Sequence, residues 1–267
     1  MLTKETECLY TFKRSSYDEN KVFFSNYLAK LKKPFDDYLE MNINSSVFYS
    51  ISYRDDHIGF FSVLEEKYLT SFYLPDSLLF LAKDIFMLIV RDFNIEMILV
   101  TSFDEMSLCL CTDHLSNIKT HYLYYTQSCL PVRNPEYAYD LFRKARYKDI
   151  ESIKKYSGSF IDLHKQRIDK EQLYILEDKT GLFLGLGLII PHTLQSGICS
   201  LGVFIREDKR NNYAGRSILL HLSAVAKERK LSVRCACPVS NEAYGRALES
   251  AGFVNDSRLF VVYIDHN

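Results

Sequence analysis

The sequence predicts a mixed α/β (α+β) fold that is used twice, once in each half of the chain. Both halves place helical segments ahead of the alternation typical of antiparallel strands, and both close with a strand–helix–strand crossover. Between them, the segment Leu130–Glu136 contains two prolines among polar residues, which favours an extended linker over a helix. A length of 267 residues is enough for two domains.

We therefore predict an N-terminal domain over residues 1–130, a linker over 131–138 and a C-terminal domain over 139–267. The halves agree in the order of their elements and not in residue identity, so the similarity indicates a repeated architecture. In each domain we expect a mixed, mostly antiparallel sheet flanked by helices.

The second half gives the clearer order of elements. Leucine-rich and alternating runs predict its strands, and apolar residues spaced three and four apart predict its helices. The hairpin turn falls at Asp178–Gly181. The expected strands are 140–146, 172–177, 182–190, 197–205, 232–237 and 259–264, and the expected helices are 148–156, 160–170, 215–230 and 241–251. The helix over 215–230 has one apolar face, made of Ile218, Leu219, Leu222, Val225 and Ala226.

The first half shows the same kinds of signal. Ser77 is the expected N-cap of an amphipathic helix, and Arg54–His57 is an expected turn. The expected strands are 47–53, 58–64, 68–74, 95–101 and 120–126, and the expected helices are 21–38, 77–91 and 105–115.

Composition limits the possible partners and locations. The net charge of −1 provides no basic excess for a nucleic acid. The seven cysteines show no paired C-x-x-C spacing, so we expect reduced thiols in the cytoplasm and no metal site. Residues 1–7 lack the apolar core of a signal peptide. The most apolar stretch, 78–90, is broken by Lys83-Asp84 and is too short to span a bilayer, so we expect no membrane partner.

The turn Arg210–Arg216 carries the strongest functional signal. It joins the strand over 200–205 to the start of the helix at Gly215. Backbone N–H groups at the positive end of a helix dipole form a natural phosphate site. The alternative reading is a polar turn that caps a helix and binds no ligand.

Three residue groups in this half together resemble the GNAT superfamily of acyl-CoA-dependent N-acyltransferases. The turn Arg210-x-x-Tyr213-x-Gly215 is similar to the family's [Gln/Arg]-x-x-Gly-x-[Gly/Ala] loop. Asn241 follows the next strand, and Gly252-Phe253 ends the following helix. The resemblance covers residues 139–267 well and residues 20–127 in outline.

The resemblance implies acetyl-CoA as co-substrate. Pantetheine and the acyl group would lie along Val203, Phe204 and Ile205, and Asn241 would bond pantetheine from the neighbouring strand. The implied phosphate cradle is Arg210, Asn211, Asn212, Tyr213, Ala214, Gly215 and Arg216.

Tyr213 departs from the family pattern, which has glycine at that position. We expect a side chain to fit there only if its backbone angles are ordinary and its ring points away from the phosphates.

The catalytic groups are less well marked. Many family members have a tyrosine where this chain has Leu248, and Tyr244, one turn earlier, is the candidate substitute as proton donor; packing in the core is its alternative role. The glutamate that serves as base in one branch of the family is replaced by Cys199.

The base therefore stays open between Glu171, Glu177, His192 and none, the last applying if the acceptor arrives as free amine. For Cys199, a small buried hydrophobe is a better interpretation than an acyl-cysteine nucleophile.

The first half has no room for a phosphate cradle, because Pro75-Asp76-Ser77 follows its strand directly. We expect this half not to bind CoA and to wall the acceptor pocket or complete a shared sheet. The resulting hypothesis is an N-acetyltransferase that acts on a primary amine by direct attack. A non-catalytic CoA-binding or structural pseudo-acetyltransferase is the alternative, and an aminoacyl-transferring relative, which needs an aminoacyl-tRNA partner, is disfavoured by the near-neutral charge. The sequence specifies neither the acceptor nor the oligomeric state.

Overall fold

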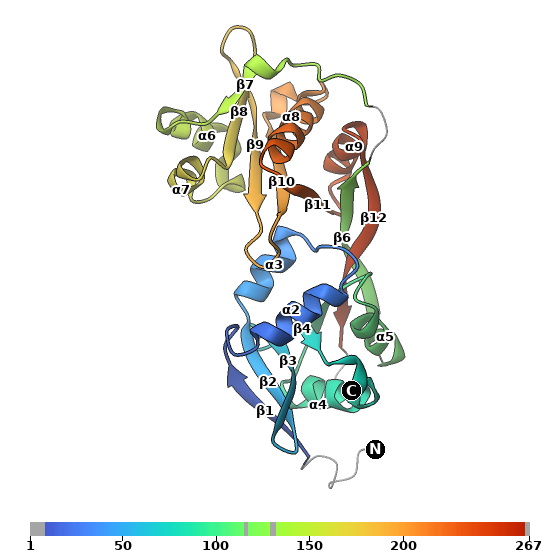
Figure 1. Cartoon of the computed structure of the whole chain (residues 1–267). Helices are drawn as coiled ribbons and strands as arrows, with labels where there is room; N and C mark the ends of the chain where they lie inside the picture. Colours follow the sequence, from blue (N-terminus) through green and yellow to red (C-terminus); the bar gives the residue numbers. More distant parts are fainter. Residues whose placement is uncertain (1–8, 115–116, 129–131, 265–267) are drawn as a thin grey trace. The chain divides into compact units, whose positions relative to one another are not determined.

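The computed structural model describes residues 9–114, 117–128 and 132–264, which form two compact units (Figure 1). The first unit holds the residues up to Tyr122 and those from Ser257 onward, and the second runs from Leu123 to Asp256. This division differs from the predicted domains, whose boundary lay at 131–138. It falls inside β6 (Asn117–Gln127) and β12 (Phe253–Tyr263), each of which gives residues to both units. Residues 130 and 131 of the predicted linker region lie outside the described residues.

The first unit is a mostly antiparallel sheet carrying helices. Its strands follow the order β1-β2-β3-β4-β5-β12; β4 and β5 pair in parallel, and the other recorded pairs are antiparallel. Its remaining strands are β1 (Tyr10–Ser15), β2 (Val47–Tyr53), β3 (Asp56–Leu64), β4 (Tyr68–Tyr73) and β5 (Met97–Thr101), and its helices are α2 (Lys21–Lys30), α3 (Asp37–Asn44), η1 (Asp76–Leu81), α4 (Ala82–Asp92) and α5 (Glu105–His114).

The predicted helix over 21–38 is two helices. α2 ends at Lys30, and α3 begins after Asp36, whose carboxylate accepts hydrogen bonds from the N–H groups of Tyr38 and Leu39 at 3.2 Å. Pro34 has no N–H to continue a helix, and a new N-cap starts the next one. The prediction overlooked both signals.

The helix predicted from Ser77 also begins differently. Residues 76–81 form the 3₁₀ turn η1, in which Leu78 N donates to Pro75 O at 2.9 Å, and the α-helix starts only at Ala82. Ser77 is therefore not its N-cap. A tight i→i+3 turn is a common way to enter a helix.

The second unit has the order of elements expected for it (Figure 1). Its strands run β11-β10-β9-β8-β7; β10 and β11 pair in parallel, and the pairs from β10 to β7 are antiparallel. Its strands are β7 (Phe142–Lys144), β8 (Leu173–Glu177), β9 (Phe183–Pro191), β10 (Ile198–Ile205) and β11 (Ser232–Pro238), its helices are α6 (Ile150–Ser157), α7 (His164–Asp169), α8 (Ala214–Glu228) and α9 (Glu242–Ser250), and its short 3₁₀ turns are η2 (Tyr139–Leu141), η3 (Tyr147–Asp149), η4 (Gly158–Phe160) and η5 (Glu207–Lys209).

Two cores hold this sheet. α8 and α9 pack on the face that carries Cys199 and Leu201, and α6 and the segment after it pack on the face that carries Leu186 and Leu188. The predicted apolar face of α8 is confirmed, because all five of its residues are buried. α8 comes close to β9 at Gly187, where a Cβ would lie 2.7 Å from a methyl carbon of Ile218.

The last strand is longer than predicted. β12 starts at Phe253 and not at 259, although residues 254–258 are mostly polar. Those polar side chains have partners: Asn255 Nδ2 donates to Tyr124 O at 2.8 Å, and Asp256 pairs with Arg234 at 2.7 Å. β1 was not predicted at all; it pairs with residues 48–53 of β2. Among the described residues no helix is both long and apolar enough to cross a membrane.

Candidate functional site

The sheet of the second unit opens between its two parallel strands. In the described structure β10 and β11 pair only where each begins, and the last partners are Cys199 and Val233. β10 nevertheless continues to Ile205 and β11 to Pro238. Central strands normally pair the peptide groups on both edges. From Ser200 onward, the inner edge of β10 is therefore available to an extended ligand.

Every second peptide of β10 is directed to this opening. Arg206 N donates to Leu184 O of β9 at 3.0 Å, so the even-numbered residues bond to β9. Peptide directions alternate along a strand, so Leu201, Val203 and Ile205 present their N–H and C=O groups on the opposite side. The opening is thus lined by peptide groups in the spacing of a β-strand, which an amide-containing chain can match.

The three predicted pantetheine contacts divide between two faces. Val203 and Ile205 pack against the core under α8 and α9, and their peptide groups point to the opening. Phe204 lies on the other face, where its ring is 5.6 Å from that of Phe160. Phe204 also directs its peptide to β9, so only its two neighbours retain the predicted main-chain role.

The loop after β10 presents a run of backbone donors. In the described part of the chain, the N–H groups of residues 211–216 donate to no backbone carbonyl. They lie at the start of α8, which has no acidic residue in its first turn. The side chains of Arg210, Asn211 and Asn212 are exposed. A positive helix end with open N–H groups and no carboxylate is suited to bind phosphate.

The expectation for Tyr213 was wrong in its first part. Its backbone is not ordinary: φ is +57°, in the left-handed region, and φ of Asn211 is +64°. Tyr213 thus keeps the kind of conformation that glycine adopts easily, at a cost of about 1–2 kcal/mol. Its ring is 59% exposed and stacks against the Arg216 guanidinium at 4.8 Å, so it does not fill the loop.

Arg216 contributes less to the cradle than predicted. Its side chain is buried, and Nη2 donates to Asn134 O at 3.1 Å. It holds the segment that precedes η2, as do the next residues of α8: Ser217 Oγ accepts from Glu136 N at 3.0 Å, and His221 Nε2 lies 2.8 Å from Tyr137 O. Only the backbone N–H of Arg216 is left for a phosphate.

Helix α9 brings a hydroxyl to the opening. Asn241 caps α9, its side-chain oxygen accepting from Tyr244 N at 3.1 Å. Tyr244 Oη donates to Leu201 O at 2.7 Å, which places the hydroxyl on the inner edge of β10. Leu248, at the family's tyrosine position, is completely buried in the core. The two residues on one helix face therefore have different roles.

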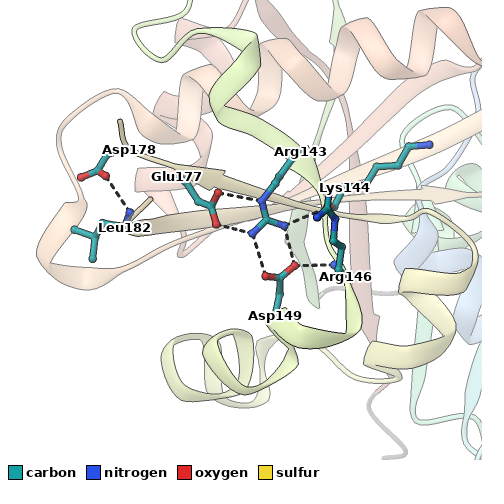
Figure 2. Close-up of polar contacts among 7 residues, drawn as sticks. All are labelled: Arg143, Lys144, Arg146, Asp149, Glu177, Asp178 and Leu182. Carbon is teal, nitrogen blue, oxygen red and sulfur yellow. Dashed lines mark hydrogen bonds and ion pairs between the residues drawn. The ribbon is translucent and has the colours of Figure 1, made fainter. Parts of the chain in front are cut away.

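The predicted carboxylate bases are held in ion pairs. Figure 2 shows Arg143 between Glu177 and Asp149: its Nη2 lies 2.5 Å from Glu177, and its Nη1 lies 2.8 Å from Asp149. Glu171 is half exposed and pairs with Lys144 at 2.7 Å and with Arg229 at 3.6 Å. Both glutamates are therefore already paired with cations.

Two other candidates differ in their surroundings. Cys199 is completely buried, and burial raises the pKa of its thiol to about 12, so it is a structural residue and not a nucleophile. His192, just after β9, is buried with Nε2 3.0 Å from Ser200 Oγ. Local sequence does not single out Ser200, because its partner depends on the β9–β10 register. The described residues contain no cluster able to hold a metal ion.

The first unit contains a similar but closed arrangement. β4 and β5 also pair only at their starts, and α5 is capped by Asp104, the counterpart of Asn241. Asp104 is buried, and burial raises the pKa of its carboxyl; Tyr27 donates to it at 3.2 Å. After β4, Lys30 bonds Leu74 O and the Asp76 carboxylate. A carboxylate thus follows each of the two strands, Asp76 after β4 and Asp104 after β5. A CoA site would need hydrogen-bond donors at these places.

Comparisons with known proteins support this picture. Residues 16–128 match a family model described as an acetyltransferase (GNAT) domain. The match falls on the half that resembles the family only in outline by sequence, so the first unit retains more of the family's pattern than its missing loop suggested. A search of curated protein sequences found no match.

Solved structures match over nearly the whole length. A GNAT-family acetyltransferase from Colwellia psychrerythraea has a TM-score of 0.84 at 17% identity, covering 96% of this chain and 100% of that one. A GCN5-related N-acetyltransferase from Sphaerobacter thermophilus has a TM-score of 0.63 at 12% identity, covering 95% and 94%. A tandem GNAT protein from the clavulanic acid biosynthesis pathway has a TM-score of 0.51 at 12% identity, covering 96% and 98%.

At these identities the solved structures establish the fold, and the family model adds the acetyltransferase class. Residues 16–128 thus match a GNAT acetyltransferase domain, and the chain as a whole has the fold of the solved GNAT acetyltransferases.

Proposed function

We propose that the protein is an N-acyltransferase that moves an acetyl group from acetyl-CoA to a primary amine, with the acyl-CoA bound in the second unit. The observation that carries this proposal is the opening between β10 and β11, which leads directly to the open N–H groups at the start of α8. The first provides a strand edge for pantetheine, and the second provides donors for the pyrophosphate.

The residues present fit such a ligand. The pyrophosphate would meet the N–H groups of residues 211–216, with Arg210 as the nearby exposed cation. The amides of pantetheine would pair with the peptide groups of Val203 and Ile205. At roughly 3.3 Å per residue, Ile205 lies about 13 Å along the strand from Leu201, so the thioester would reach the start of the opening.

The reaction proposed is direct attack. The amine nitrogen forms a bond with the thioester carbon, the carbon–sulfur bond breaks, and the electron pair leaves with sulfur. Tyr244 is the proposed proton donor for the departing thiolate, because its hydroxyl already lies at Leu201. The tyrosine regains a proton from the nitrogen as the amide forms.

We further propose that the first unit does not bind acyl-CoA. It has no loop of open N–H groups after β4, because η1 begins there at once. The Asp76 carboxylate lies at the start of η1, and Asp104 is buried nearby in the same unit. These acidic groups would offer a phosphate no compensation for the water that it loses on binding. We place the activity in the cytoplasm, since Cys199, Cys235 and Cys237 are free thiols, as is usual in a reducing compartment.

The first experiment is calorimetric titration of acetyl-CoA into the wild type and into Gly215→Glu, with Gly215→Gln as the uncharged control. A Cβ at Gly215 would lie 3.7 Å from Ala247 Cβ and 3.8 Å from Ile205 Cγ1, which are ordinary contacts, and the far-ultraviolet circular dichroism of both variants checks that the longer side chains leave the fold unchanged. We expect binding in the wild type and in Gly215→Gln, and loss of binding when the carboxylate faces the phosphates.

Turnover then separates the proposal from its alternative. CoA release on a panel of primary amines would support the enzyme. Tight acetyl-CoA binding with no release on any amine would favour a CoA-binding pseudo-acetyltransferase, for which Leu248 in the tyrosine position is the motivating residue. If neither the wild type nor the Gly215 variants bound acetyl-CoA, both the enzyme and the CoA-binding pseudo-acetyltransferase would be rejected.

A further inference from the structure

The ring of Tyr213 lies on the loop that joins β10 to α8, and one of its two faces is covered. The Arg216 guanidinium sits over that face, 4.8 Å from the ring centroid. Arg216 is itself held in place, because its side chain is buried and Nη2 donates to Asn134 O at 3.1 Å. The Tyr213 ring is nevertheless 59% exposed, so its other face is directed to solvent.

The side chain of Tyr213 makes no second recorded interaction. In the described part of the chain, neither its hydroxyl nor its ring forms a further hydrogen bond or ring contact. A tyrosine has few rotatable bonds, and here a buried cation already holds the ring. A planar ligand that stacks on the open face would therefore cost little side-chain entropy. Exposed aromatic rings of this kind serve as stacking platforms for nucleobases.

The ring also stands at the donors proposed for the pyrophosphate. Tyr213 lies in the middle of the run of open N–H groups at residues 211–216. Ile205 before the loop and Ala214 at its end pack into the core of the second unit. The side chains of residues 210–213 between them are exposed, and Tyr213 is the aromatic one. No carboxylate occurs in residues 210–216, so the loop does not repel a nucleotide.

Acyl-CoA has two arms, which leave its pyrophosphate in different directions. Under the proposed function, pantetheine runs from the loop along β10 toward Leu201. The ribose and adenine must then leave the loop on its solvent side, where the side chains of residues 210–213 are exposed. Only the ribose separates the adenine from the pyrophosphate, so the base comes within reach of the ring at position 213.

We infer that the open face of the Tyr213 ring stacks on the adenine base of acyl-CoA. The loop thereby selects thioesters that carry the nucleotide over thioesters of phosphopantetheine alone. This inference rests on the proposed function and names the part of the donor that the loop recognises beyond its phosphates.

The test compares the affinities of two donors by calorimetry, acetyl-CoA and S-acetyl-4′-phosphopantetheine. The second donor keeps the acetyl group, the pantetheine and one phosphate but lacks the adenosine, and it is titrated in competition with acetyl-CoA. Tyr213→Asn removes the ring with a residue that tolerates the left-handed backbone at φ +57°, and Tyr213→Phe keeps the ring. The control is Phe80→Asn, which removes a 76% exposed ring from the first unit.

We expect Tyr213→Asn to lose about tenfold in affinity for acetyl-CoA and to keep its affinity for S-acetyl-4′-phosphopantetheine within about twofold, because only the first donor has a base to stack. Tyr213→Phe and Phe80→Asn should match the wild type for both donors. Far-ultraviolet circular dichroism checks the fold of each variant. If Tyr213→Asn does not fold, Tyr213→Gly takes its place, since glycine adopts the left-handed conformation most easily.

Equal losses for both donors would show that Tyr213 only shapes the loop, and would overturn the inference alone. So would an unchanged affinity for acetyl-CoA in the ringless variant, or the same loss in Tyr213→Phe or Phe80→Asn. Equal affinity of the wild type for the two donors would have the same consequence. Failure of the wild type to bind acetyl-CoA would overturn the proposed function and this inference with it.

Discussion

The hydroxyl of Tyr244 donates to the carbonyl oxygen of Leu201 at 2.7 Å, joining the first turn of α9 to the inner edge of β10. This contact places a phenol at the start of the opening between the two parallel strands. It also separates Tyr244 from Leu248, which lies one turn later and is completely buried.

Tyr244→Phe should lower kcat with an accepted amine by about 10²–10⁴-fold, the range for loss of a general acid. Acetyl-CoA affinity should stay within about threefold, because the ring and its packing remain. Steady-state kinetics with calorimetry on the same preparations measures both. A matching loss in Tyr213→Phe, which removes an exposed hydroxyl on the loop, would contradict the assignment.

Tyr213→Gly should leave the fold as stable as the wild type or more so, within about 1 kcal/mol, because it relieves the left-handed conformation at φ +57°. The ring stacked on Arg216 is lost, which offsets part of that gain. Tyr213→Val should be less stable, by about 1–2 kcal/mol, since a β-branched residue fits the left-handed region poorly. Urea unfolding compares the stabilities of the two variants. Equal stabilities of Tyr213→Gly and Tyr213→Val would show that the loop leaves the left-handed conformation when residue 213 is changed.

Asp149→Asn should destabilise the second unit by about 1–3 kcal/mol at pH 7, because it weakens a partly buried pair with Arg143. Burial by itself would raise the pKa of Asp149, but hydrogen bonds from Arg143 and from Arg146 N–H lower it. A carboxyl with a lowered folded-state pKa adds stability above its unfolded pKa, about 3.9, and loses it as pH falls through the lower folded value.

The wild type and Asp149→Asn should therefore converge in stability as the pH is lowered from 7 toward about 3. Urea unfolding across this range measures the difference. Glu171→Gln, at a more exposed pair with Lys144, is the control and should show no measurable change at neutral pH. A constant gap between wild type and Asp149→Asn at all pH values would mean that the charge of Asp149 does not stabilise the fold.

Gly187→Ala should destabilise the second unit by about 1–3 kcal/mol. The new Cβ would lie 2.7 Å from Ile218 Cγ2 and 2.9 Å from Leu222 Cδ1, so α8 must move away from β9. Gly215→Ala, with no contact nearer than 3.7 Å, is the matched control and should be neutral. Thermal unfolding tests the pair, and equal effects at both sites would argue against the close approach.

Acetyl-CoA should bind with a stoichiometry of one per chain, because among the residues that the structure describes only the second unit has the loop of open N–H groups. Calorimetry of the wild type gives this number directly. Gly215→Glu should remove all binding. A stoichiometry near two, or binding that survives in Gly215→Glu, would show that the first unit also holds acyl-CoA.

Local sequence signals predicted most elements of the second unit, since its strands alternate clearly and α8 has one apolar face. They failed where tertiary partners override local preference. The polar start of β12 is a strand because Asn255 and Asp256 find partners in β6 and β11. The predicted domain boundary failed for a related reason: proline and glycine mark local turns, but which unit a strand joins depends on its pairing.

The sequence by itself determined the order of elements, the position of the loop at 210–216 and the candidate tyrosine, because turn residues, apolar spacing and a helix start are local properties. Only the tertiary structure decided what each side chain does there. It turned Arg216 toward Asn134, kept Leu248 in the core and brought His192 to Ser200. These outcomes depend on strand register and helix packing, which join residues that local sequence leaves apart.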